Sequence, residues 1–469
     1  MFHSTGAADA VTYQLEPGPG TEGQAVGSTA RAGLASFLGF VQRAGVARAL
    51  AAAVHLPVQE RRNGFTHVQK SLALLAALAA GCRSARESDF TLAPDPTAVA
   101  VLGVPRWPHS SQLTRHLHAF HPQHVQALRR ATEDLVATHS AARRRLRRGA
   151  RVVVDIDQTA ISANGRTYQR TARGHFPKKG ARGYQATAVF AGDTGGGADE
   201  VLAVWLDPGN AHATWRFADA LDALERVLGP LERLPGLVLR FDCQYATPDD
   251  LALLLRRRIH FVGRVYADAT AAGWAREHRE TLAWRELSPV KWVAELGDGP
   301  VAPSRPEVVC RRLLVRSTGA RHRCGYTAIV TDLPVADLPP AELEPFYEAR
   351  QTIEGWLSEA TAALQLKGLW SRRFDGLEAV LLHAALGSNL LNWWERRDLL
   401  PDSGLPHLGL RQLIGRVITM PGRLVQTATG HLVVLLPPTH AYARRLVPTA
   451  PGWQLPLPFD YLVLCDAHF

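Results

Sequence analysis

The stretch Val152-Val153-Val154-Asp155-Ile156-Asp157 decides the fold class of this chain. Its short run of β-branched apolar residues predicts a buried strand. Because side chains alternate along a strand, Asp155 and Asp157 lie on the same face. A carboxylate at the end of a central strand stands at a sheet edge, where open α/β sheets place their functional sites. This stretch therefore predicts both a sheet and a candidate site.

The residues that follow alternate between strand and helix. A strand pattern recurs at 184–190, 200–207, 237–242 and 259–265. The segment 211–228 has an amphipathic helical pattern between the third and fourth strands, and 249–258 has one between the fourth and fifth. Three strands, then helix, strand, helix and strand are typical of an α/β layered domain.

The 469 residues exceed the size of a single hydrophobic core, so we expect about three domains or one large domain with an insertion. We expect a disordered tail at 1–30, a helical region at 31–150 and the first part of the α/β core at 151–265. A β-rich insertion should follow at 266–340, with strands at 291–296, 308–316 and 326–331. The helical second part of the core is expected at 341–400, and a C-terminal region at 401–469 should contain a helix at 410–417 and a hairpin at 423–436.

The charge balance favours a polyanionic partner. Lys plus Arg number 53 against 43 Asp plus Glu, which gives a net charge of +10. The run Arg143-Arg144-Arg145-Leu146-Arg147-Arg148 is either a solvated helix end or a contact to the DNA backbone, and the overall charge favours DNA. Five scattered cysteines argue against disulfides or structural zinc and favour a reducing cytoplasm. No segment is long enough and apolar enough to predict a membrane span.

Acidic residues elsewhere extend the candidate site. Asp242 ends the fourth strand, and converging carboxylates suit Mg²⁺, which prefers oxygen ligands. Tyr347, Arg350 and Glu354 fall on one narrow stripe of an expected helix that runs from Pro340 to about Gln365. Such a stripe could contact a phosphate and a metal together. Helical geometry alone favours a surface stripe with an Arg350–Glu354 pair.

These residues resemble a known signature. The spacing Tyr347-x2-Arg350-x3-Glu354 matches the Y-x2-R-x3-E-x6-K motif of DDE transposases from bacterial insertion sequences, most like the thirteen-eighty type within the "four" superfamily. The resemblance covers about residues 60 to 445, and its strength lies in the order and spacing of several weak motifs. The other matching segments are Asp157-Gln158-Thr159, Lys179-Gly180-x2-Gly183-Tyr184, Asp207-Pro208-Gly209-Asn210, Arg240-Phe241-Asp242-Cys243-Gln244-Tyr245 and Ser388-Asn389-Leu390-Leu391.

The resemblance implies an RNase H-like mixed sheet flanked by helices, with a β-rich insertion between the second and third carboxylates. Asp157, Asp242 and Glu354 would be catalytic and would bind two Mg²⁺ ions, with Mn²⁺ as a substitute, about 4 Å apart. Asp155, Tyr347 and Arg350 would support them, although Asp155 remains an alternative first ligand. The expected phosphate contacts are Lys178, Lys179, Arg182, Arg372 and Arg373.

Some positions depart from the family pattern. Thr361 stands where the family has lysine, and Cys243-Gln244-Tyr245 replaces Ser-Gly-Phe beside Asp242. Trp274, Trp284 and Trp292 lie in the insertion; a core role is favoured, although related transposases stack an insertion tryptophan on a flipped base.

The resemblance thus implies a transposase that binds terminal inverted repeats of double-stranded DNA, cuts them and joins them to target DNA. It would act as a homodimer on DNA, associated with the nucleoid in the cytoplasm and with no membrane partner. Two alternatives stay open: an inactive or domesticated DNA-binding relative, and an RNase H-like nuclease without strand transfer.

Overall fold

The structure is a computed structural model of the whole chain. It describes residues 11–15, 23–58, 60, 64–165, 167–174, 176, 178, 180–192, 199–265, 268–318, 324–427 and 432–447. Two compact units are present: the first comprises 1–139, 165–170 and 358–469, and the second comprises 140–164 and 171–357. Within the described residues, no helix combines the length and apolar character that crossing a bilayer requires.

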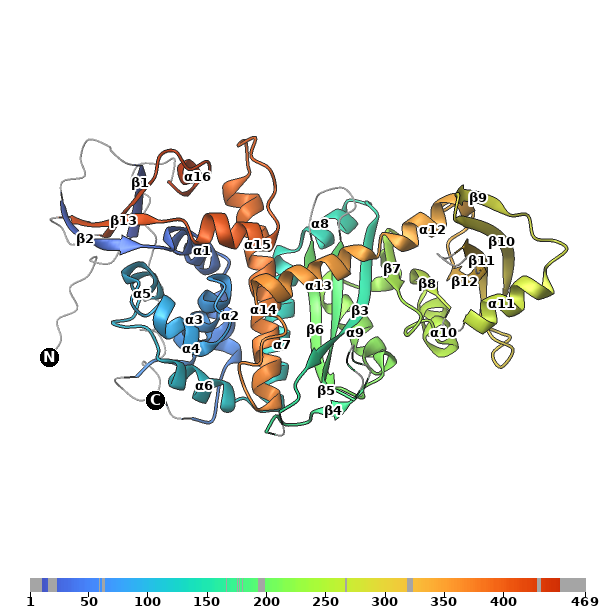
Figure 1. Cartoon of the computed structure of the whole chain (residues 1–469), viewed down its shortest axis with the longest axis horizontal. Helices are drawn as coiled ribbons and strands as arrows, with labels where there is room; N and C mark the ends of the chain where they lie inside the picture. The colour runs from blue at the N-terminus through green and yellow to red at the C-terminus, as the bar shows by residue number, and fades with distance from the viewer. Residues whose placement is uncertain are drawn as a thin grey trace. The chain divides into compact units, whose positions relative to one another are not determined.

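The second unit is built on one large mixed sheet (Figure 1). Strand β3 runs antiparallel to β5 on one side and parallel to β7 on the other, and β6 and β8 follow outward. This order is consistent with an RNase H-like fold, and the five strands expected from the sequence are all present. The strands are β3 (Val152–Ser162), β4 (Ala172–Arg173), β5 (Arg182–Gly192), β6 (Glu200–Pro208), β7 (Leu237–Phe241) and β8 (His260–Arg264).

Helices cover both faces of this sheet. On one face, Phe217 of α9 (Phe217–Leu228) packs edge-on against Phe241 of β7, with ring centroids 5.8 Å apart. On the other face, Trp356 of α13 (Gln351–Ala363) stacks on Phe190 of β5 at 5.3 Å. Phe190 is opposite Asp155 in the β3–β5 register, so the aspartates of β3 face the side covered by α13. Helix α10 (Pro248–Arg257) also belongs to this core.

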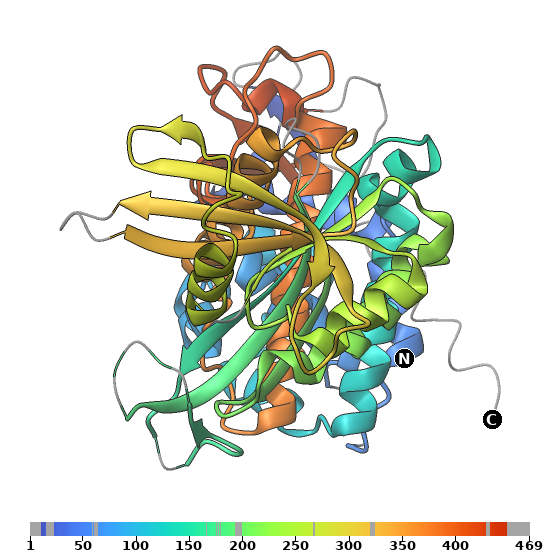
Figure 2. The same ribbon diagram turned by 90° about the vertical axis from the view of Figure 1, so that its right-hand side faces the viewer.

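The expected β-rich insertion extends the same sheet. Strand β12 pairs antiparallel with β8, and β11, β10 and β9 follow in turn (Figure 2). The three strands expected here are present, whereas the helix α11 and the short strand β9 were not expected. These elements are α11 (Asp268–Glu277), β9 (Arg285–Ser288), β10 (Lys291–Pro300), β11 (Val309–Thr318) and β12 (Cys324–Thr331).

The single helix expected from Pro340 to about Gln365 is wrong in one respect. Two helices occupy this stretch, α12 (Pro340–Glu348) and α13, and Arg350 lies in the turn between them. The chain tightens there, because Arg350 N donates to the Tyr347 carbonyl at 3.0 Å, three residues back. Arg350 and Glu354 nevertheless remain one turn apart.

The first unit combines helices with a small sheet of order β1-β14-β13-β2. The expected hairpin is present as β13 (Gly422–Thr427) and β14 (Leu432–Leu436), and its turn residues Thr429 and Gly430 lie outside the described residues. A disordered tail over 1–30 is wrong for β1 (Val11–Leu15) and β2 (Gly23–Thr29), which pair with this hairpin. The main-chain pairing comes from residues distant in sequence, so periodicity within 1–30 did not reveal it.

Helices make up most of the first unit, as expected. The long α14 packs against α7 and α3. These helices are α1 (Ala32–Arg43), α2 (Val46–Ala53), α3 (His67–Ala79), α4 (Ala85–Thr91), α5 (Pro96–Leu102), α6 (Ser110–His118), α7 (Pro122–His139), α14 (Phe374–Trp394), α15 (Leu410–Leu413) and α16 (Ala443–Leu446), with π-helical turns at Glu395–Leu399 and Ile414–Ile418.

The arginine run belongs to the second unit rather than to the helical N-terminal region. It lies in α8 (Ala141–Arg147), whose N-terminus is held by Glu200 at the start of β6. The Glu200 carboxylate accepts hydrogen bonds from Ser140 Oγ at 2.6 Å and from Ala141 N at 2.7 Å. A carboxylate in this position binds free backbone N–H groups and complements the helix dipole. The boundary expected at 150 therefore lies near 140.

Candidate active site

Asp155 forms a closed ion pair inside the second unit. Arg240 is its register partner on β7, and the guanidinium binds both carboxylate oxygens, Nε to Oδ1 at 2.7 Å and Nη2 to Oδ2 at 2.9 Å. Both side chains are fully buried. Burial raises the pKa of Asp155, and the Arg240 guanidinium opposes that rise. Asp155 thus has no oxygen facing solvent and is committed to a structural contact.

Asp157, two residues farther along β3, is less enclosed. Its side chain is 13% exposed, and Oδ2 lies 3.1 Å from Nη1 of Arg350. The Gln158 amide donates to the other carboxylate oxygen at 2.8 Å. Burial raises the pKa of Asp157 to about 6, with Arg350 opposing the rise and the charge of Asp242 adding to it. This carboxylate retains oxygens that a ligand could reach.

Asp242 follows the end of β7 on the same face. Since Ile156 is opposite Phe241 in the parallel β3–β7 register, the next step sets Asp157 beside Asp242. The Gln244 amide donates to Asp242 Oδ1 at 2.9 Å and fixes the carboxylate in a tight turn. Burial raises the pKa of Asp242. Two carboxylates placed side by side repel each other and favour a shared cation.

Glu354 brings the third carboxylate from the first turn of α13. Its Oε1 accepts a hydrogen bond from Nη2 of Arg350 at 2.8 Å, and its side chain is 53% exposed. The Arg350 guanidinium therefore contacts Asp157 and Glu354 at once and also interacts with Asp242. These carboxylates hold the pKa of Arg350 above its usual value, although burial acts against them. One guanidinium thus interacts with three acids.

Tyr347 lies beside this cluster but is buried in an apolar core. It packs with Leu343 of α12 and with Val262 of β8. Burial raises the pKa of its phenol to about 12, so the hydroxyl stays protonated at neutral pH. Tyr347 is therefore placed to support the carboxylate cluster by packing, and its neutral hydroxyl can form a hydrogen bond.

The donor chemistry of this cluster fits a hard divalent cation. All three candidate ligands are carboxylates, and oxygen ligands are those that Mg²⁺ and Mn²⁺ accept. Nevertheless, the described residues contain no group of three His, Cys, Asp or Glu side chains arranged closely enough to hold a metal ion. The cation that joins Asp157 and Glu354 is Arg350. A metal at this position would therefore require the guanidinium to move aside.

The comparison with protein families decides what kind of protein carries this cluster. The family described as "Transposase DDE domain group 1" matches residues 20–450. The chain belongs to this family of DDE transposases. The resemblance drawn from the sequence is thereby confirmed at the level of the family, whereas the type of insertion sequence is not tested. DDE transposases act on DNA and generally use divalent metal ions.

Other comparisons add little to this assignment. No match to this chain was found among curated proteins. Among solved structures, a piggyBac transposase in a synaptic complex with hairpin DNA is similar over 92% of this chain and 84% of that chain. With 10% identity and a TM-score of 0.42, this likeness establishes neither fold nor function. The family match thus rests on sequence alone.

The residues expected to contact DNA phosphates are divided between the two units. Lys178 and Arg182 are exposed in the second unit, and Arg182 Nη2 donates to the Thr171 carbonyl at 2.6 Å. Arg372 is exposed in the first unit, where the half-buried Arg373 directly precedes α14. Lys179 lies outside the described residues. None of the four described cations is part of the carboxylate cluster.

Sequence reasoning missed the role of Arg240. The strand 237–242 and its Arg-x-Asp spacing were visible, but no role was assigned to the arginine. A buried arginine in an apolar strand requires a carboxylate partner, and Asp155 stands on the neighbouring strand with the same alternation. The signal for this ion pair was therefore an arginine in one apolar strand and an aspartate in the neighbouring apolar strand.

The three insertion tryptophans divide into two groups. Trp274 is buried, and the Arg312 guanidinium lies 5.0 Å from its ring centroid, which agrees with the favoured core role. Trp284 and Trp292 are half-buried, with Arg316 4.7 Å from both ring centroids. Each arginine contact is a cation–π interaction that stabilises the sheet face.

Proposed function

We propose that this chain binds the terminal inverted repeats of its own insertion sequence, cleaves the ends and joins them to target DNA by Mg²⁺-dependent phosphoryl transfer. The observation that supports this most is the meeting of Asp157, Asp242 and Glu354 around one guanidinium, in a chain of the DDE transposase family. The element would be of the thirteen-eighty type.

Asp157, Asp242 and Glu354 would hold the metal. When bound, Mg²⁺ supplies activation of a water or 3′-hydroxyl and stabilises the leaving oxygen at phosphorus. Asp157 and Asp242 are set by adjacent parallel strands, so their separation is maintained by backbone pairing. Glu354 lies on α13, whose Trp356 is stacked on the sheet. Asp157 and Glu354 thus stand on a strand and a helix, and Asp242 directly follows a strand.

Arg350 has a second role in this proposal. Once released from Asp157 and Glu354, its planar guanidinium would bind a phosphate of the DNA through two parallel hydrogen bonds. Burial of Tyr347 keeps a neutral hydroxyl near the same position. Asp155 would act only by holding Arg240 and the end of β7 in place, which makes Asp157 the first ligand.

DNA would be bound over a wider surface. Lys178, Lys179, Arg182, Arg372 and Arg373 would contact backbone phosphates, and these contacts carry no sequence information by themselves. The helical region at 31–139 would recognise the ends or pair them. Two transposon ends must be handled together, so we expect a homodimer on DNA and association with the nucleoid.

Excision of a marked DNA segment flanked by the element's own ends tests this proposal in cells. The native chain should excise and reinsert the segment, and Asp157→Ala, Asp242→Ala and Glu354→Ala should abolish both events. Asp155→Asn should retain excision in proportion to the folded protein. Asp222→Ala, an exposed carboxylate on α9, is the matched control and should leave excision unchanged.

The competing functions give different results in the same assay. An RNase H-like nuclease would cut the ends without reinsertion. A non-catalytic DNA-binding relative, which the threonine at position 361 and the altered segment after Asp242 favour, would bind the ends without cutting them. Loss of excision in the native folded chain with the ends still bound would therefore contradict our proposal.

A further inference from the structure

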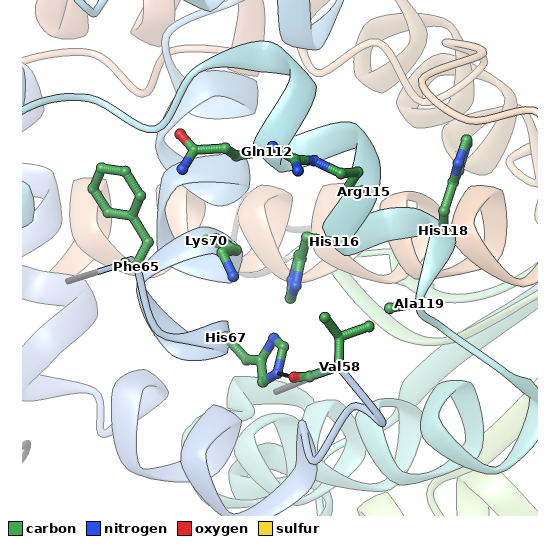
Figure 3. A pocket seen from close by; sticks show the side chains of 10 residues that line it. Val58, Phe65, His67, Lys70, Gln112, Arg115, His116, His118 and Ala119 are labelled. Carbon is green, nitrogen blue, oxygen red and sulfur yellow. Dashed lines mark hydrogen bonds between the residues drawn. The ribbon is translucent and has the colours of Figure 1, made fainter. Parts of the chain in front are cut away.

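A pocket of about 400 Å³ lies within the first unit, between the start of α3, the helix α6 and the segment that precedes α3 (Figure 3). This volume is in the range of small-molecule binding sites. Phe65 and Ala119 provide apolar wall, and polar side chains from both helices point into the space. The pocket contains none of the residues of the carboxylate cluster.

The charged groups that line this pocket are cationic. Lys70 and Arg115 both line it, and no carboxylate is among its described lining residues. No described residue forms a hydrogen bond or an ion pair with the Lys70 ammonium. Arg115 Nε donates to the Ser111 carbonyl of its own helix at 3.2 Å. This bond does not use the two terminal nitrogens of the guanidinium. Two cations, Lys70 half-buried and Arg115 exposed, with no carboxylate between them favour an anion.

The pKa of Lys70 supports this interpretation. Burial lowers it most, the nearby carboxylate of Glu60 opposes this, and the charge of Arg115 lowers it by a smaller amount. Glu60 does not line the pocket; it accepts a hydrogen bond from the His67 amide. The pocket therefore retains a positive balance that a bound anion would relieve.

Neutral hydrogen-bonding groups stand beside the cations. The His67 and His116 rings stack at a centroid distance of 5.6 Å. Nε2 of His67 bonds the Val58 carbonyl at 2.9 Å and Nε2 of His116 bonds Ser71 Oγ at 3.0 Å. The two Nδ1 atoms are buried and have no partner among the described residues, and His116 is 3% exposed.

Gln112 adds an amide to this side of the pocket. Its Oε1 accepts a hydrogen bond from the His109 amide at 3.0 Å, in the capping box that begins α6. Its NH₂ group has no partner in the part of the chain that the structure describes. The Nδ1 atoms of His67 and His116 are buried and costly when unpaired, so a ligand that pairs with them gains affinity.

We propose that this pocket binds a nucleotide. Lys70 and Arg115 would bind its phosphate, while the base would lie along the apolar wall and the imidazoles, with Gln112 and the Nδ1 atoms facing its polar edge. A phosphate alone would leave the wall and the neutral groups unused. A free nucleotide and a single nucleotide extruded from a DNA strand have the same chemical groups. Base-flipping proteins bind an extruded nucleotide in a pocket of this kind.

Titration of the full-length chain with each of the four deoxynucleoside monophosphates tests the proposal. At least one should bind with one-to-one stoichiometry, and the matching nucleoside without phosphate should bind at least about tenfold more weakly. Lys70→Met and Arg115→Met should each weaken binding by a similar factor. Arg86→Met, an exposed arginine on the neighbouring α4, should have no effect. Lys70→Arg keeps the charge and should retain most of the binding.

A competition experiment distinguishes the two sources of the nucleotide. A duplex of the element's end that carries one unpaired nucleotide should displace a fluorescent nucleotide if the natural ligand belongs to DNA. Displacement by neither that duplex nor a fully paired one would identify a free nucleotide as the ligand. Equal displacement by both duplexes would indicate a backbone contact and would overturn the nucleotide pocket.

Three further results would contradict the proposal. These are absence of binding by every monophosphate, equal binding in native, Lys70→Met and Arg115→Met chains, and binding of inorganic phosphate as tight as that of the best nucleotide. Asp157→Asn should leave nucleotide binding unchanged, because Asp157 is not part of the pocket. The outcome is therefore independent of the catalytic assignment.

Discussion

Asp155 and Asp157 are two residues apart on β3, lie on the same face of the sheet and each contact one arginine. The Asp155–Arg240 pair is closed, since both side chains are fully buried and two hydrogen bonds use both carboxylate oxygens. The Asp157–Arg350 pair is open, because the guanidinium also reaches Glu354 and both aspartate and glutamate are accessible.

One strand thus carries a carboxylate that stabilises the fold, Asp155, and a carboxylate that can bind a ligand, Asp157. A buried ion pair is stable only when both partners stay in place, so Asp155 cannot change partner without a large cost. Arg350 joins carboxylates that a metal could hold instead, and the turn between α12 and α13 places it outside a regular helix. Asp157 can therefore change partner.

The largest expected effect comes from opening the closed pair. Asp155→Ala should lower the free energy of unfolding by about 3–5 kcal/mol, because Arg240 is left buried without a counter-charge. Chemical denaturation of purified protein measures this. The double variant Asp155→Leu/Arg240→Met should recover most of the loss. A loss below about 1 kcal/mol for Asp155→Ala would show that the pair is not closed.

Asp157→Asn should have the opposite effect on stability. The raised pKa of Asp157, about 6 against 3.8, means that the folded chain resists its ionisation, which costs about 3 kcal/mol at pH 7.5. The sign follows from proton binding: between these values the folded state holds more protons, so stability falls as pH rises. The gain from asparagine should shrink to about 1 kcal/mol at pH 4.5.

Denaturation in the presence of a chelator at both pH values checks this prediction. Asp222→Asn on the exposed face of α9 serves as the control and should show no such pH dependence. A variant that is less stable than the native chain at pH 7.5 would mean that Asp157 contributes as Asp155 does.

Removal of Arg350 should strengthen metal binding without DNA. In Arg350→Met the carboxylates lose their shared cation, so Mn²⁺ should bind about tenfold more tightly, equivalent to about 1.4 kcal/mol. Calorimetric titration with Mn²⁺ measures this, and Arg257→Met is the control because its partners lie on α9. Weaker Mn²⁺ binding by Arg350→Met would indicate that the guanidinium does not compete with a metal.

The smallest effect concerns an arginine without a carboxylate partner among the described residues. Arg182→Ala should weaken DNA binding a few-fold and reduce the slope of log affinity against log salt by about 1. Arg305→Ala, an arginine paired with Asp249 and Glu307, should leave the slope unchanged. Binding titrations at several salt concentrations test this, and an unchanged slope for Arg182→Ala would exclude a phosphate contact there.

The strands β3, β5, β6, β7 and β8 could be predicted from sequence because each is a short apolar run bounded by turn residues. The pairing of β12 with β8 could not, since sheet neighbours are set by tertiary packing rather than by local pattern. The same reason explains β1 and β2, whose partners lie near the other end of the chain.

Within the candidate site, strand alternation predicted that Asp155 and Asp157 share a face. It could not separate their roles, because that depends on the partner supplied by β7. The helical stripe predicted the Arg350–Glu354 pair correctly, although the helix is interrupted at Arg350. The contact of Arg350 with Asp157 joins segments far apart in sequence, and no local rule predicts it.

Iron-mediated cleavage of the protein backbone tests the central claim most directly. Fe²⁺ replaces Mg²⁺ in oxygen-ligand sites and, with ascorbate and peroxide, cuts the chain near the bound metal. Our account predicts cuts near Asp157, Asp242 and Glu354 in the native chain, suppressed by excess Mg²⁺ and lost in Asp157→Asn. Cuts elsewhere, or an unchanged pattern in Asp157→Asn, would contradict the proposal that these three carboxylates form one metal site.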